Sequence, residues 1–451
     1  MTTTPYDICI LGAGISGLYC ARELHTKYPT QSICILEKYN GIGGRIATFR
    51  KDGMQFEEGA GRIHASHHRI LALLKEYKIA LHPISDVIEY RTAKGSEPVE
   101  FGKYLTNLSP LHELPPDLLS KTTLKGLLGL ILDPTLVSDI VSHYEYRYER
   151  DTLRADKAIE ALQGELGDHA GFYVVKEGFS KVIHALKVTL ERFKTVTILR
   201  SHEVTDLHPK DGQYEIQLKK RPSLYAKKVI VTLPRDALAA LPCFKDLPIL
   251  KHVEMRPLVR IYATFPLPKK GQKIWFDGLH SFICEPPVRY VIPLSPEKGT
   301  CMISYTDGSD AEYWIKHPTN PEVRCMKQIR ALFPHLVIPD PIYCKVFSWS
   351  SGCSYWTPGT YTVKYRSQDP SYGGVSIASS YIDSTPSQRS TTKSHVLRKR
   401  GIFDFVPCGS TNTSVNLTPM PNVYLCGESW AEKQCWVESA LETSTQVLQL
   451  L

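Results

Sequence analysis

The sequence has no hydrophobic run long enough to cross a membrane. A membrane-spanning helix needs roughly 18 consecutive apolar residues, and the apolar stretch Leu124–Leu132 is limited by Lys125 and Asp133. A first strand is predicted to begin by about residue 6, which leaves no room for a signal or transit peptide. We therefore expect a cytoplasmic protein without a membrane anchor.

The cysteines and the basic residues are scattered, which excludes several classes of site. There are 12 cysteines and no C-x-x-C pair, so we expect reduced thiols and no metal site. The net charge is +8, and the lysines and arginines are spread along the chain. His395–Arg400 is the one compact basic run, and we interpret it as a solvated loop. No nucleic-acid partner is expected.

A glycine-rich turn follows the first predicted strand. The apolar run Ile8–Leu11 leads into Gly12, Gly14 and Gly17 in the pattern G-x-G-x-x-G, and a predicted helix follows. The first glycine permits a tight turn, the second lets the backbone approach a pyrophosphate, and the third lets the helix pack close to the sheet. The helix N-terminus then directs its N–H groups and partial positive charge at the phosphates.

The second strand adds an acid and another glycine cluster. Ile33–Leu36 ends at Glu37, which is placed to accept hydrogen bonds from a ribose diol. Gly43, Gly44 and Arg45 follow and suit the other side of a pyrophosphate. A nicotinamide-only enzyme would not need this second cluster. The two segments together predict FAD as the cofactor.

At this point the chain resembles the flavin-containing amine oxidoreductases, which include the monoamine and polyamine oxidases. In that family an L-E-x-x-x-x-x-G-G-R stretch holds FAD, and the residues from Glu37 to Arg45 match it. The C-terminal residues resemble a second family motif, with Gly427 and Glu428 after a strand and Val437 at a helix start. The resemblance implies that Glu428 bonds the ribityl chain and that a backbone N–H near Val437 faces the flavin O2, where reduction places negative charge.

The fold is predicted to be α/β, with a Rossmann-like FAD-binding domain of the glutathione-reductase/amine-oxidase type and an inserted α+β substrate domain. The FAD-binding domain is expected over residues 1–85, 170–240 and 405–451, and the substrate domain over 86–169 and 241–404. Helices are expected at 67–77, 118–132, 134–144, 153–163 and 180–190. Strands are expected at 195–199, 204–207, 214–218 and 228–233, with Val204 beside the cofactor.

One segment near the N-terminus is expected beside the flavin because it resembles a family segment. Gly59 and Ala60 begin G-A-G-R-I-H, which is similar to the G-A-x-W-I-H-G of polyamine oxidases. Arg62 replaces the tryptophan, and His64 falls where the family places an active-site histidine. The alternative for His64 is a surface histidine beside His67 and His68.

Two later segments complete the candidate catalytic set. Tyr355 and Trp356 resemble the aromatic wall that faces the flavin, although core aromatics remain the alternative. Arg260, in R-I-Y-A-T-F, replaces a family lysine that holds a water near flavin N5. Arginine keeps a cation and donors but cannot deprotonate to act as a base. Cys353 lies near the position of a covalent flavin link in some monoamine oxidases, and we expect no such link here.

The resemblance implies oxidation of a primary or secondary amine, either a polyamine or a monoamine. Hydride would pass to flavin N5, and O2 would reoxidise the flavin to give H2O2. Two alternatives stay open. Arg260 favours an FAD-dependent desaturase or oxidase of a non-amine substrate. The altered residues Arg62, Arg260 and Ser439 favour a non-catalytic, flavin-binding structural or interaction protein. The oligomeric state is left open.

Overall fold

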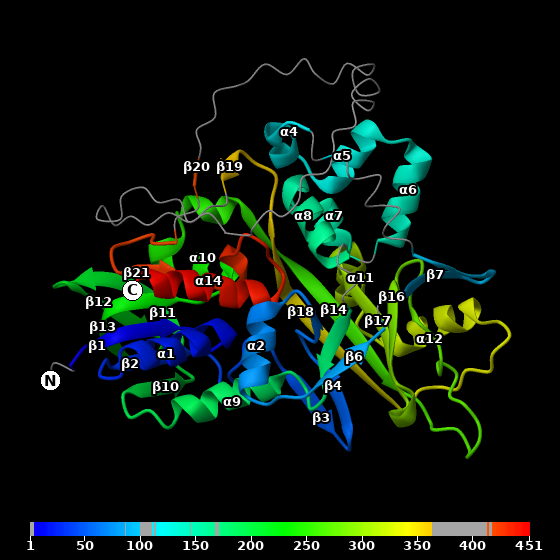
Figure 1. The fold of residues 1–451 in the computed structure, drawn as a ribbon, viewed down its shortest axis with the longest axis horizontal. Coiled ribbons are helices and arrows are strands. Elements are labelled where there is room, and N and C mark those ends of the chain that lie inside the picture. Colours follow the sequence, from blue (N-terminus) through cyan, green and yellow to red (C-terminus); the bar gives the residue numbers. More distant parts are fainter. Residues whose placement is uncertain are drawn as a thin grey trace, which may run out of the picture.

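The computed structural model describes residues 4–85, 87–99, 111, 114–144, 146–166, 171–362, 413–414 and 417–451. Within them the chain forms a mixed α/β fold with two large sheets, one around β1 and β13 and the other around β14 and β17 (Figure 1). The predicted α/β fold is confirmed. The basic run His395–Arg400 lies outside the described residues.

The centre of the first sheet is built from apolar runs whose side chains are mostly buried. β1 (Tyr6–Leu11) pairs in parallel with β2 (Ile33–Glu37), and β13 pairs in parallel with β1 on its other side. Branched apolar side chains favour such central strands. Among the described residues the order is β10-β2-β1-β13-β12-β11, with β21 also on β13; the remaining bounds are β10 Val196–Arg200, β11 Val204–Lys210, β12 Gln213–Leu218, β13 Arg221–Val231 and β21 Val423–Leu425.

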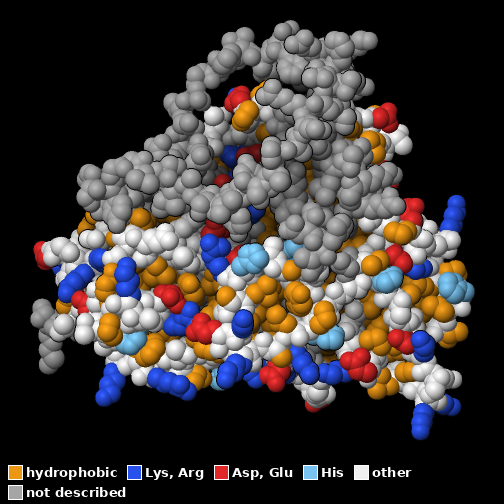
Figure 2. Space-filling view, viewed as in Figure 1, with side chains coloured by type: hydrophobic (Ala, Val, Ile, Leu, Met, Phe, Trp, Pro, Cys, Tyr) orange, Lys and Arg blue, Asp and Glu red, His pale blue; other side chains and the backbone are white. Residues whose placement is uncertain are grey.

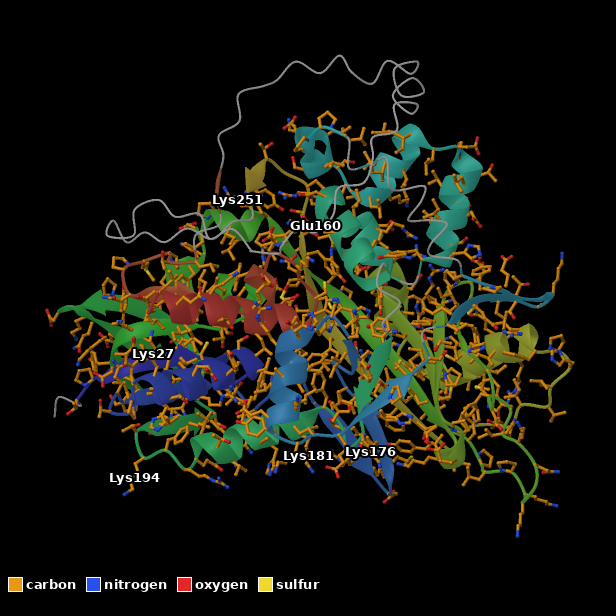
Figure 3. All side chains as sticks on the ribbon, viewed as in Figure 1. Lys27, Glu160, Lys176, Lys181, Lys194 and Lys251 are labelled. Carbon is orange, nitrogen blue, oxygen red and sulfur yellow. The ribbon has the colours of Figure 1, made fainter. Side chains whose placement is uncertain are left out.

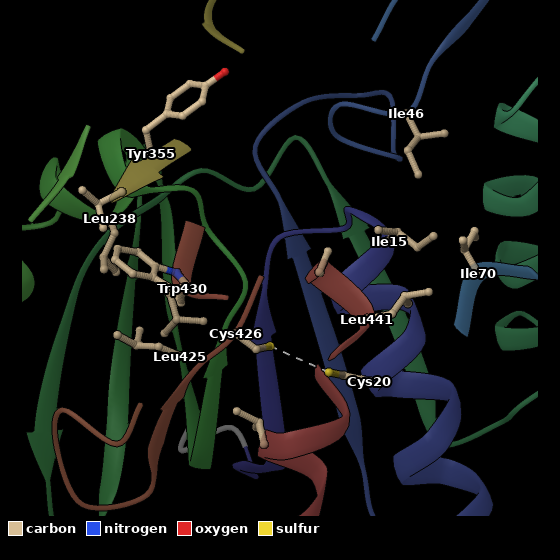
Figure 4. Close-up of a cluster of buried hydrophobic side chains, with 14 of the residues drawn as sticks. Ile15, Cys20, Ile46, Ile70, Leu238, Tyr355, Leu425, Cys426, Trp430 and Leu441 are labelled. Carbon is tan, nitrogen blue, oxygen red and sulfur yellow. Dashed lines mark hydrogen bonds between the residues drawn. The ribbon is translucent and has the colours of Figure 1, made fainter. Parts of the chain in front are cut away.

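The first and last helices pack against each other beside this sheet. α1 (Ile15–Lys27) and α14 (Val437–Gln449) lie side by side in Figure 1. Figure 4 shows Cys20 of α1 facing Cys426, with 3.9 Å between their Sγ atoms, and Leu441 of α14 beside α1. These contacts join the two ends of the chain, as the paired N- and C-terminal motifs predict. Two further helices, α2 (His68–Glu76) and α9 (Ser180–Leu190), contact α14 and α1 respectively.

The second sheet collects strands from two separate stretches of sequence. β7, from the stretch before the helical region, pairs in parallel with β15. Among the described residues the order is β18-β14-β17-β16-β15-β7-β8, with the bounds β7 Ile88–Thr92, β8 Gly95–Pro98, β14 Val253–Thr264, β15 Ser281–Ile283, β16 Tyr290–Ser295, β17 Thr300–Asp307 and β18 Tyr343–Trp356. The predicted domain boundaries stay a prediction.

Strand β14 gives the second sheet two different faces. Val259, Ile261 and Ala263 belong to a core that also contains Trp314 of α11 (Gly308–Lys316) and Ile329 of α12 (Pro321–Leu332). Because side chains alternate along a strand, Arg260 and Tyr262 point to the opposite face. That face is turned to the segment that ends in Glu57, since the Tyr262 hydroxyl donates to the Glu57 carbonyl at 2.8 Å. The alternation therefore brings Arg260 to the interior of the molecule.

Residues 114–144 and 146–166 are mainly helical, as predicted, but the single helix expected over 118–132 is wrong. The structure has α4 (Pro116–Lys121) and α5 (Leu124–Ile131) instead. Thr123 separates them, because its Oγ1 accepts from Gly126 N at 3.2 Å and caps α5. Hydroxyl side chains favour such cap positions over helix interiors. The next helices are α6 (Pro134–His143), α7 (Arg147–Asp151) and α8 (Ala155–Leu166), which group beside the second sheet in Figure 1.

Smaller elements complete the described chain. They are the hairpin β3 (Thr48–Lys51) and β4 (Met54–Glu57), an antiparallel sheet of β5 (Arg62–His64), β9 (Phe172–Val175) and β6 (Leu81–Ile84), the pair β19 (Tyr361–Thr362) and β20 (Thr413–Ser414), the helix α10 (Arg235–Ala239), and the 3-10 turns η2 (Pro242–Phe244), η3 (Pro248–Lys251), η4 (Pro296–Lys298) and η5 (Glu428–Trp430).

The surface carries mixed charge. Acidic and basic side chains are interspersed over the described part of the face in Figure 2. The labelled lysines Lys27, Lys181, Lys194 and Lys251 project from different elements in Figure 3. No helix in the described ranges is long and apolar enough to span a bilayer.

Candidate cofactor and active site

The glycine-rich turn has the shape that its sequence predicts. Gly12 has a φ of +108°, and a Cβ there would lie 2.7 Å from Thr232 Oγ1. A Cβ on Gly17 would lie 2.0 Å from the Gly12 carbonyl oxygen. A Cβ on Gly14 would instead meet no heavy atom within 4 Å. The fold itself therefore requires Gly12 and Gly17, whereas Gly14 leaves room that suits a pyrophosphate.

The second glycine cluster lies directly against this turn. Gly43 N donates to Ala13 O at 2.8 Å, and a Cβ on Gly44 would lie 3.5 Å from Gly14 Cα. Helix α1 starts beyond Gly14, and no side chain caps its N-terminus. Uncapped N–H groups at a helix start favour an anion. The arrangement fits the pyrophosphate of FAD, and the individual glycine contacts stay predictions.

Glu37 shapes the turn as well as ending its strand. Its Oε2 accepts from Ala13 N at 2.9 Å and its Oε1 accepts from Tyr39 N at 3.0 Å. Each carboxylate oxygen keeps a second lone pair, which a ribose hydroxyl can use. His202 N donates to the Glu37 carbonyl at 2.8 Å, which brings the segment before Val204 close to this acid. The ribose contact of Glu37 and the cofactor contact of Val204 stay predictions.

Arg45 and Glu428 connect the two ends of the predicted cofactor site. Arg45 Nη1 lies 2.8 Å from Glu428 Oε2 and also donates to Gly352 O at 3.0 Å. Glu428 further accepts from the backbone N–H groups of Ser354 and Cys435, both at 3.0 Å, and from Ser354 Oγ at 3.0 Å. No feature of the sequence predicts the contacts of Glu428 with Ser354 and Cys435.

These bonds bear on the predicted role of Glu428. A carboxylate offers about four lone-pair positions, and donors of this chain already use them. A bond from the ribityl chain would require one of these donors to give way. Gly427, with a φ of +120°, donates its N–H to Thr443 Oγ1 of α14 at 2.8 Å. This bond ties the Gly427–Glu428 pair to the helix whose start, at Val437, is predicted to face flavin O2.

The segment that follows β4 lies between Arg45 and the second sheet. Ala60 N donates to the Arg45 carbonyl at 2.9 Å, and a Cβ on Gly59 would lie 2.1 Å from that same oxygen. Trp349 Nε1 donates to Glu58 O at 2.7 Å. Only glycine therefore fits at position 59, and the segment is held between Arg45 and β18. Its contact with the flavin stays a prediction.

His64 lies in the interior of the molecule. It is 1% exposed, so the alternative of a surface histidine is wrong. Its Nδ1 lies 2.7 Å from Ser66 Oγ, and its ring is 5.0 Å from the ring of Phe172. His67 links it to the C-terminal helix, because His67 Nδ1 accepts from His64 N at 3.1 Å and the His67 ring lies 4.9 Å from that of Trp436. A catalytic role for His64 stays a prediction.

Arg260 is a buried cation on the inner face of β14. It is 7% exposed, and its Nη1 donates to the Glu57 carbonyl at 3.4 Å. Its Cζ lies 4.8 Å from the centre of the Tyr305 ring. Burial raises the pKa of the Glu57 carboxyl to about 7. The function of Arg260 stays a prediction.

Tyr355 and Trp356 occupy successive positions of β18 and so point to opposite faces of the sheet. The Trp356 indole is fully buried and donates to Ala431 O at 2.8 Å, a contact typical of a core aromatic. The Tyr355 ring lies 5.9 Å from that of Tyr148 and belongs to the buried cluster in Figure 4. A shared wall made of both rings conflicts with this alternation. Their catalytic roles stay predictions.

The aromatic neighbours of Arg62 are the main residues that sequence reasoning missed. Its guanidinium bonds the hydroxyl of Tyr146 and, at 3.3 Å, that of Tyr290. These tyrosines and Tyr305 come from distant parts of the chain, so the local motif gives no sign of them.

In the ranges that the structure covers, no group of three or more His, Cys, Asp or Glu residues could hold a metal ion.

Comparisons with known proteins agree with this geometry. A model of the flavin containing amine oxidoreductase family matches residues 15–163 and 140–387. Over 82 residues the chain is 32% identical to amine oxidase [flavin-containing] B of Cavia porcellus, and this aligned stretch covers 18% of this chain and 15% of that protein. Over 72 residues it is 44% identical to L-amino-acid oxidase of Mus musculus, which covers 16% of this chain and 11% of that protein. The matched segments thus span a small part of these relatives.

Solved structures match the whole fold at low identity. Wild-type putrescine oxidase bound to putrescine superposes with a TM-score of 0.70 at 14% identity, covering 99% of this chain and 98% of that one. Cyclohexylamine oxidase from Brevibacterium oxydans IH-35A gives 0.68 at 17% identity, covering 99% of both chains. These likenesses support the fold alone. The family match, which extends over most of the sequence, carries the assignment: the chain belongs to the flavin-containing amine oxidoreductase family, and its cofactor is FAD.

Proposed function

We propose that this chain is an FAD-dependent amine oxidase that oxidises a primary or secondary amine, with O2 as the final electron acceptor. The observation that carries the proposal is the family match over residues 15–163 and 140–387. The open position at Gly14, beside the uncapped start of α1, supports it because it suits the cofactor that such a reaction needs.

The chain's own residues would bind and orient the reactants. We infer that Gly14, Gly43 and Gly44 approach the pyrophosphate, and that Glu37 holds the ribose. Arg45 and Glu428 would fix the loops on either side. Bound FAD would supply a two-electron acceptor for the hydride of the carbon next to nitrogen, with O2 as the final acceptor and H2O2 as the product.

The candidate catalytic side chains would act by positioning and by excluding water. Tyr355 or Trp356, which are buried on opposite faces of β18, would exclude water from the reaction site, and His64 would help to position the substrate. Arg260 would supply a fixed positive charge. Since an arginine does not deprotonate in proteins, it cannot remove a proton from the substrate ammonium. The substrate amine reacts in its neutral form, so its ammonium proton would have to leave without the help of Arg260.

Anaerobic flavin reduction tests the proposal. The purified yellow protein is mixed without oxygen with spermine, spermidine, putrescine, monoamines, amino acids and apolar polycyclic compounds, and the loss of flavin absorbance is followed. At least one amine should bleach the flavin, and air should then restore the colour with formation of H2O2. No bleaching by any amine would contradict the proposal. Bleaching only by apolar polycyclic compounds would support the non-amine oxidase that Arg260 favours.

We also propose the domain division given by the sequence, with residues 1–85, 170–240 and 405–451 around FAD and residues 86–169 and 241–404 around the substrate. The pairing of β7 with β15 supports it, because it joins both substrate segments in one sheet. A cytoplasmic location is proposed from the free cysteines of the described residues. Cell fractionation tests the location.

A further inference from the structure

Two cysteine thiols meet beside the ion pair of Arg45 and Glu428. Cys353 lies on β18, and Cys435 lies shortly before the start of α14. Both are free and only partly buried. The side chains of Cys435 and Cys353 interact directly, and the Cys435 thiol also donates to the Ser354 carbonyl at 3.2 Å. We call Cys353 and Cys435 the dithiol pair.

The backbones of the dithiol pair are held at one oxygen atom. Oε1 of Glu428 accepts from Ser354 N and from Cys435 N, both at 3.0 Å. The Ser354 nitrogen belongs to the peptide bond that follows Cys353, so the backbones of both cysteines lie beside the same carboxylate. A disulfide requires its two Cα atoms to be within about 7 Å of each other. The shared acceptor and the direct side-chain contact support such a distance.

Arg45 places a positive charge beside the dithiol pair. Its Nη1 donates to the carbonyl of Gly352, the residue before Cys353, at 3.0 Å. Its guanidinium interacts electrostatically with both thiols. A neighbouring arginine favours the thiolate, which is the form that attacks a peroxide. Burial, and then the neighbouring Cys353 thiol, raise the pKa of the Cys435 thiol. These surroundings favour Cys353 as the thiol that reacts first.

A second pair of thiols lies close together but away from solvent. The Sγ atoms of Cys20 and Cys426 are 3.9 Å apart, and both residues are fully buried (Figure 4). The contact with Cys20, and then burial, raise the pKa of the Cys426 thiol. Structural thiols buried in this way are unreactive. The Cys20–Cys426 pair is therefore an internal control, because it has the proximity but not the exposure of the dithiol pair.

We propose that the dithiol pair is a redox-active modification site, at which hydrogen peroxide converts Cys353 and Cys435 into a disulfide. The Cys353 thiolate attacks one peroxide oxygen, so an S–O bond forms, the O–O bond breaks, and the departing hydroxide takes up the thiol proton to give water. The Cys435 thiol then attacks the sulfenic sulfur of Cys353, so the S–S bond forms, the S–O bond breaks and a second water leaves. Two thiols are oxidised and one peroxide is reduced.

Only the source of the peroxide rests on the proposed function, in which O2 is the final acceptor and H2O2 the product. The dithiol pair consumes this peroxide, and the new bond ties β18 to the segment that leads into α14. Cys353 and Cys435 are sites of modification in this proposal and take no part in amine oxidation.

Peptide mapping after peroxide treatment tests the proposal. The reduced holoenzyme is treated with H2O2, the remaining thiols are blocked with N-ethylmaleimide in denaturant, and the protein is digested without reductant for mass spectrometry. Two peptides linked through Cys353 and Cys435 should appear, and dithiothreitol should separate them. Cys20 and Cys426 should be recovered unlinked. A Cys20–Cys426 disulfide in place of the expected one, or no link between Cys353 and Cys435, would overturn the proposal.

Single variants separate the roles of the two thiols. In Cys435→Ser the sulfenic acid of Cys353 has no thiol to resolve it, so dimedone should label Cys353 at least about tenfold more than in the wild type. In Cys353→Ser, peroxide should oxidise Cys435 at least about tenfold more slowly than in the wild type. Unchanged dimedone labelling in Cys435→Ser, or unchanged oxidation in Cys353→Ser, would contradict these roles.

Cys243 provides a matched control. It is free and partly buried like the dithiol pair, but its backbone N–H donates to the Asp206 carboxylate at 3.1 Å, so an acid replaces the arginine as its neighbour. Cys243→Ser should leave formation of the disulfide unchanged. If Cys243→Ser lowered disulfide formation as much as Cys353→Ser does, the oxidation would be general and the specific pairing would be wrong.

Added peroxide separates this inference from the proposed function because it needs no turnover. If no amine bleaches the flavin but added H2O2 forms the disulfide, amine oxidation is wrong and the dithiol site stands. If an amine bleaches the flavin but added H2O2 forms no disulfide, the dithiol site is wrong and the proposed function stands. Flavin that stays attached to Cys353 after denaturation would also overturn the dithiol site, because that sulfur would not be free.

Discussion

The guanidinium of Arg45 and the carboxylate of Glu428 form an ion pair of 2.8 Å that links the second glycine cluster to the C-terminal segment. The Glu428 side chain is 7% exposed, and it also holds the backbone N–H groups of Ser354 and Cys435. One carboxylate thus fixes three segments that are distant in sequence. Glu428 therefore positions these segments relative to one another, and its effect on the cofactor site stays a prediction.

Glu428→Gln should destabilise the protein and weaken FAD binding. Arg45 loses its counter-ion, and an amide cannot accept through its nitrogen. Nitrogen in place of Oε2 removes the acceptor of Arg45 and of the Ser354 hydroxyl, whereas nitrogen in place of Oε1 removes the acceptor of both backbone N–H groups. Breaking a buried pair in this way typically costs about 3–5 kcal/mol in the free energy of unfolding. Urea unfolding and the FAD content after desalting measure the two effects. Glu191→Gln is the control, because its pair with Lys187 is on the surface, and it should cost less than about 1 kcal/mol.

Substitution of Gly14 and of Gly17 in the first turn should separate folding from FAD binding. Gly14→Val places a side chain where the fold leaves open space, so the apoprotein should fold but bind little FAD. Gly17→Ala sets a Cβ 2.0 Å from a backbone oxygen, so the protein itself should be destabilised. Circular dichroism reports folding, and flavin absorbance after desalting reports binding. In the presence of FAD, Gly14→Val should be less stable than the wild type, because bound FAD stabilises the folded state of the wild type only.

Two further variants serve as comparisons for the FAD content of Gly14→Val. Gly41→Ala, also at a position with no heavy atom within 4 Å, should keep both the fold and FAD. Glu37→Ala should weaken FAD less than Gly14→Val does, because it removes hydrogen bonds without adding bulk. Full FAD content in Gly14→Val would contradict the position assigned to the pyrophosphate.

The parts of the site that the sequence predicts are those made by neighbouring residues. The turn after β1 follows from Gly12, Gly14 and Gly17 because the positive φ of Gly12, the open position at Gly14 and the close approach of Gly17 to Gly12 all belong to one strand–turn–helix unit. The family resemblance at both ends of the chain also predicts that these ends meet, as Arg45 and Glu428 do. Local chemistry and recognisable motifs were sufficient for this much.

The rest depends on contacts between distant segments. Arg62 is visible in the sequence as a departure from the family, but its tyrosine neighbours come from α7, β16 and β17 and their approaches, and no spacing links them to it. The helix expected over 118–132 is broken at Thr123, where a side-chain cap outweighs the apolar pattern. The predicted aromatic wall of Tyr355 and Trp356 conflicts with strand geometry, which separates successive side chains.

Glu57 should make the protein less stable as the pH rises. Burial raises the pKa of its carboxyl from 4.5 to about 7. Between these values the unfolded chain loses the proton and the folded chain keeps it, so the free energy of unfolding falls by up to about 1.4 kcal/mol per pH unit. Glu57→Gln, which mimics the protonated form, should remove this contribution. Urea unfolding of both proteins at about pH 5, 6 and 7 measures this contribution. The same change of unfolding free energy with pH in wild type and in Glu57→Gln would contradict a raised pKa.

His67 should have the opposite effect on the acid side. Burial, and then the neighbouring His64 and His68, lower the pKa of its imidazole from 6.5 to about 3. The structure gives a reason: Nδ1 accepts from His64 N at 3.1 Å, and a protonated ring nitrogen cannot accept. Between these pH values the unfolded state binds the proton and the folded state does not, so the free energy of unfolding falls by up to about 1.4 kcal/mol for each unit of acidification.

His67→Asn tests this sign, because its Oδ1 can keep the bond from His64 N without titrating. The loss of the ring contact with Trp436 should lower stability at every pH, but the fall toward acid should become shallower. Since Glu57 and His67 oppose each other between pH 4.5 and 6.5, His67→Asn should leave a protein that is relatively more stable in acid, and Glu57→Gln one that is relatively less stable there. Exposed His68 provides the control, and His68→Asn should leave the acid slope in place. Parallel stability curves for wild type and His67→Asn would show that the folded protein tolerates a charged His67.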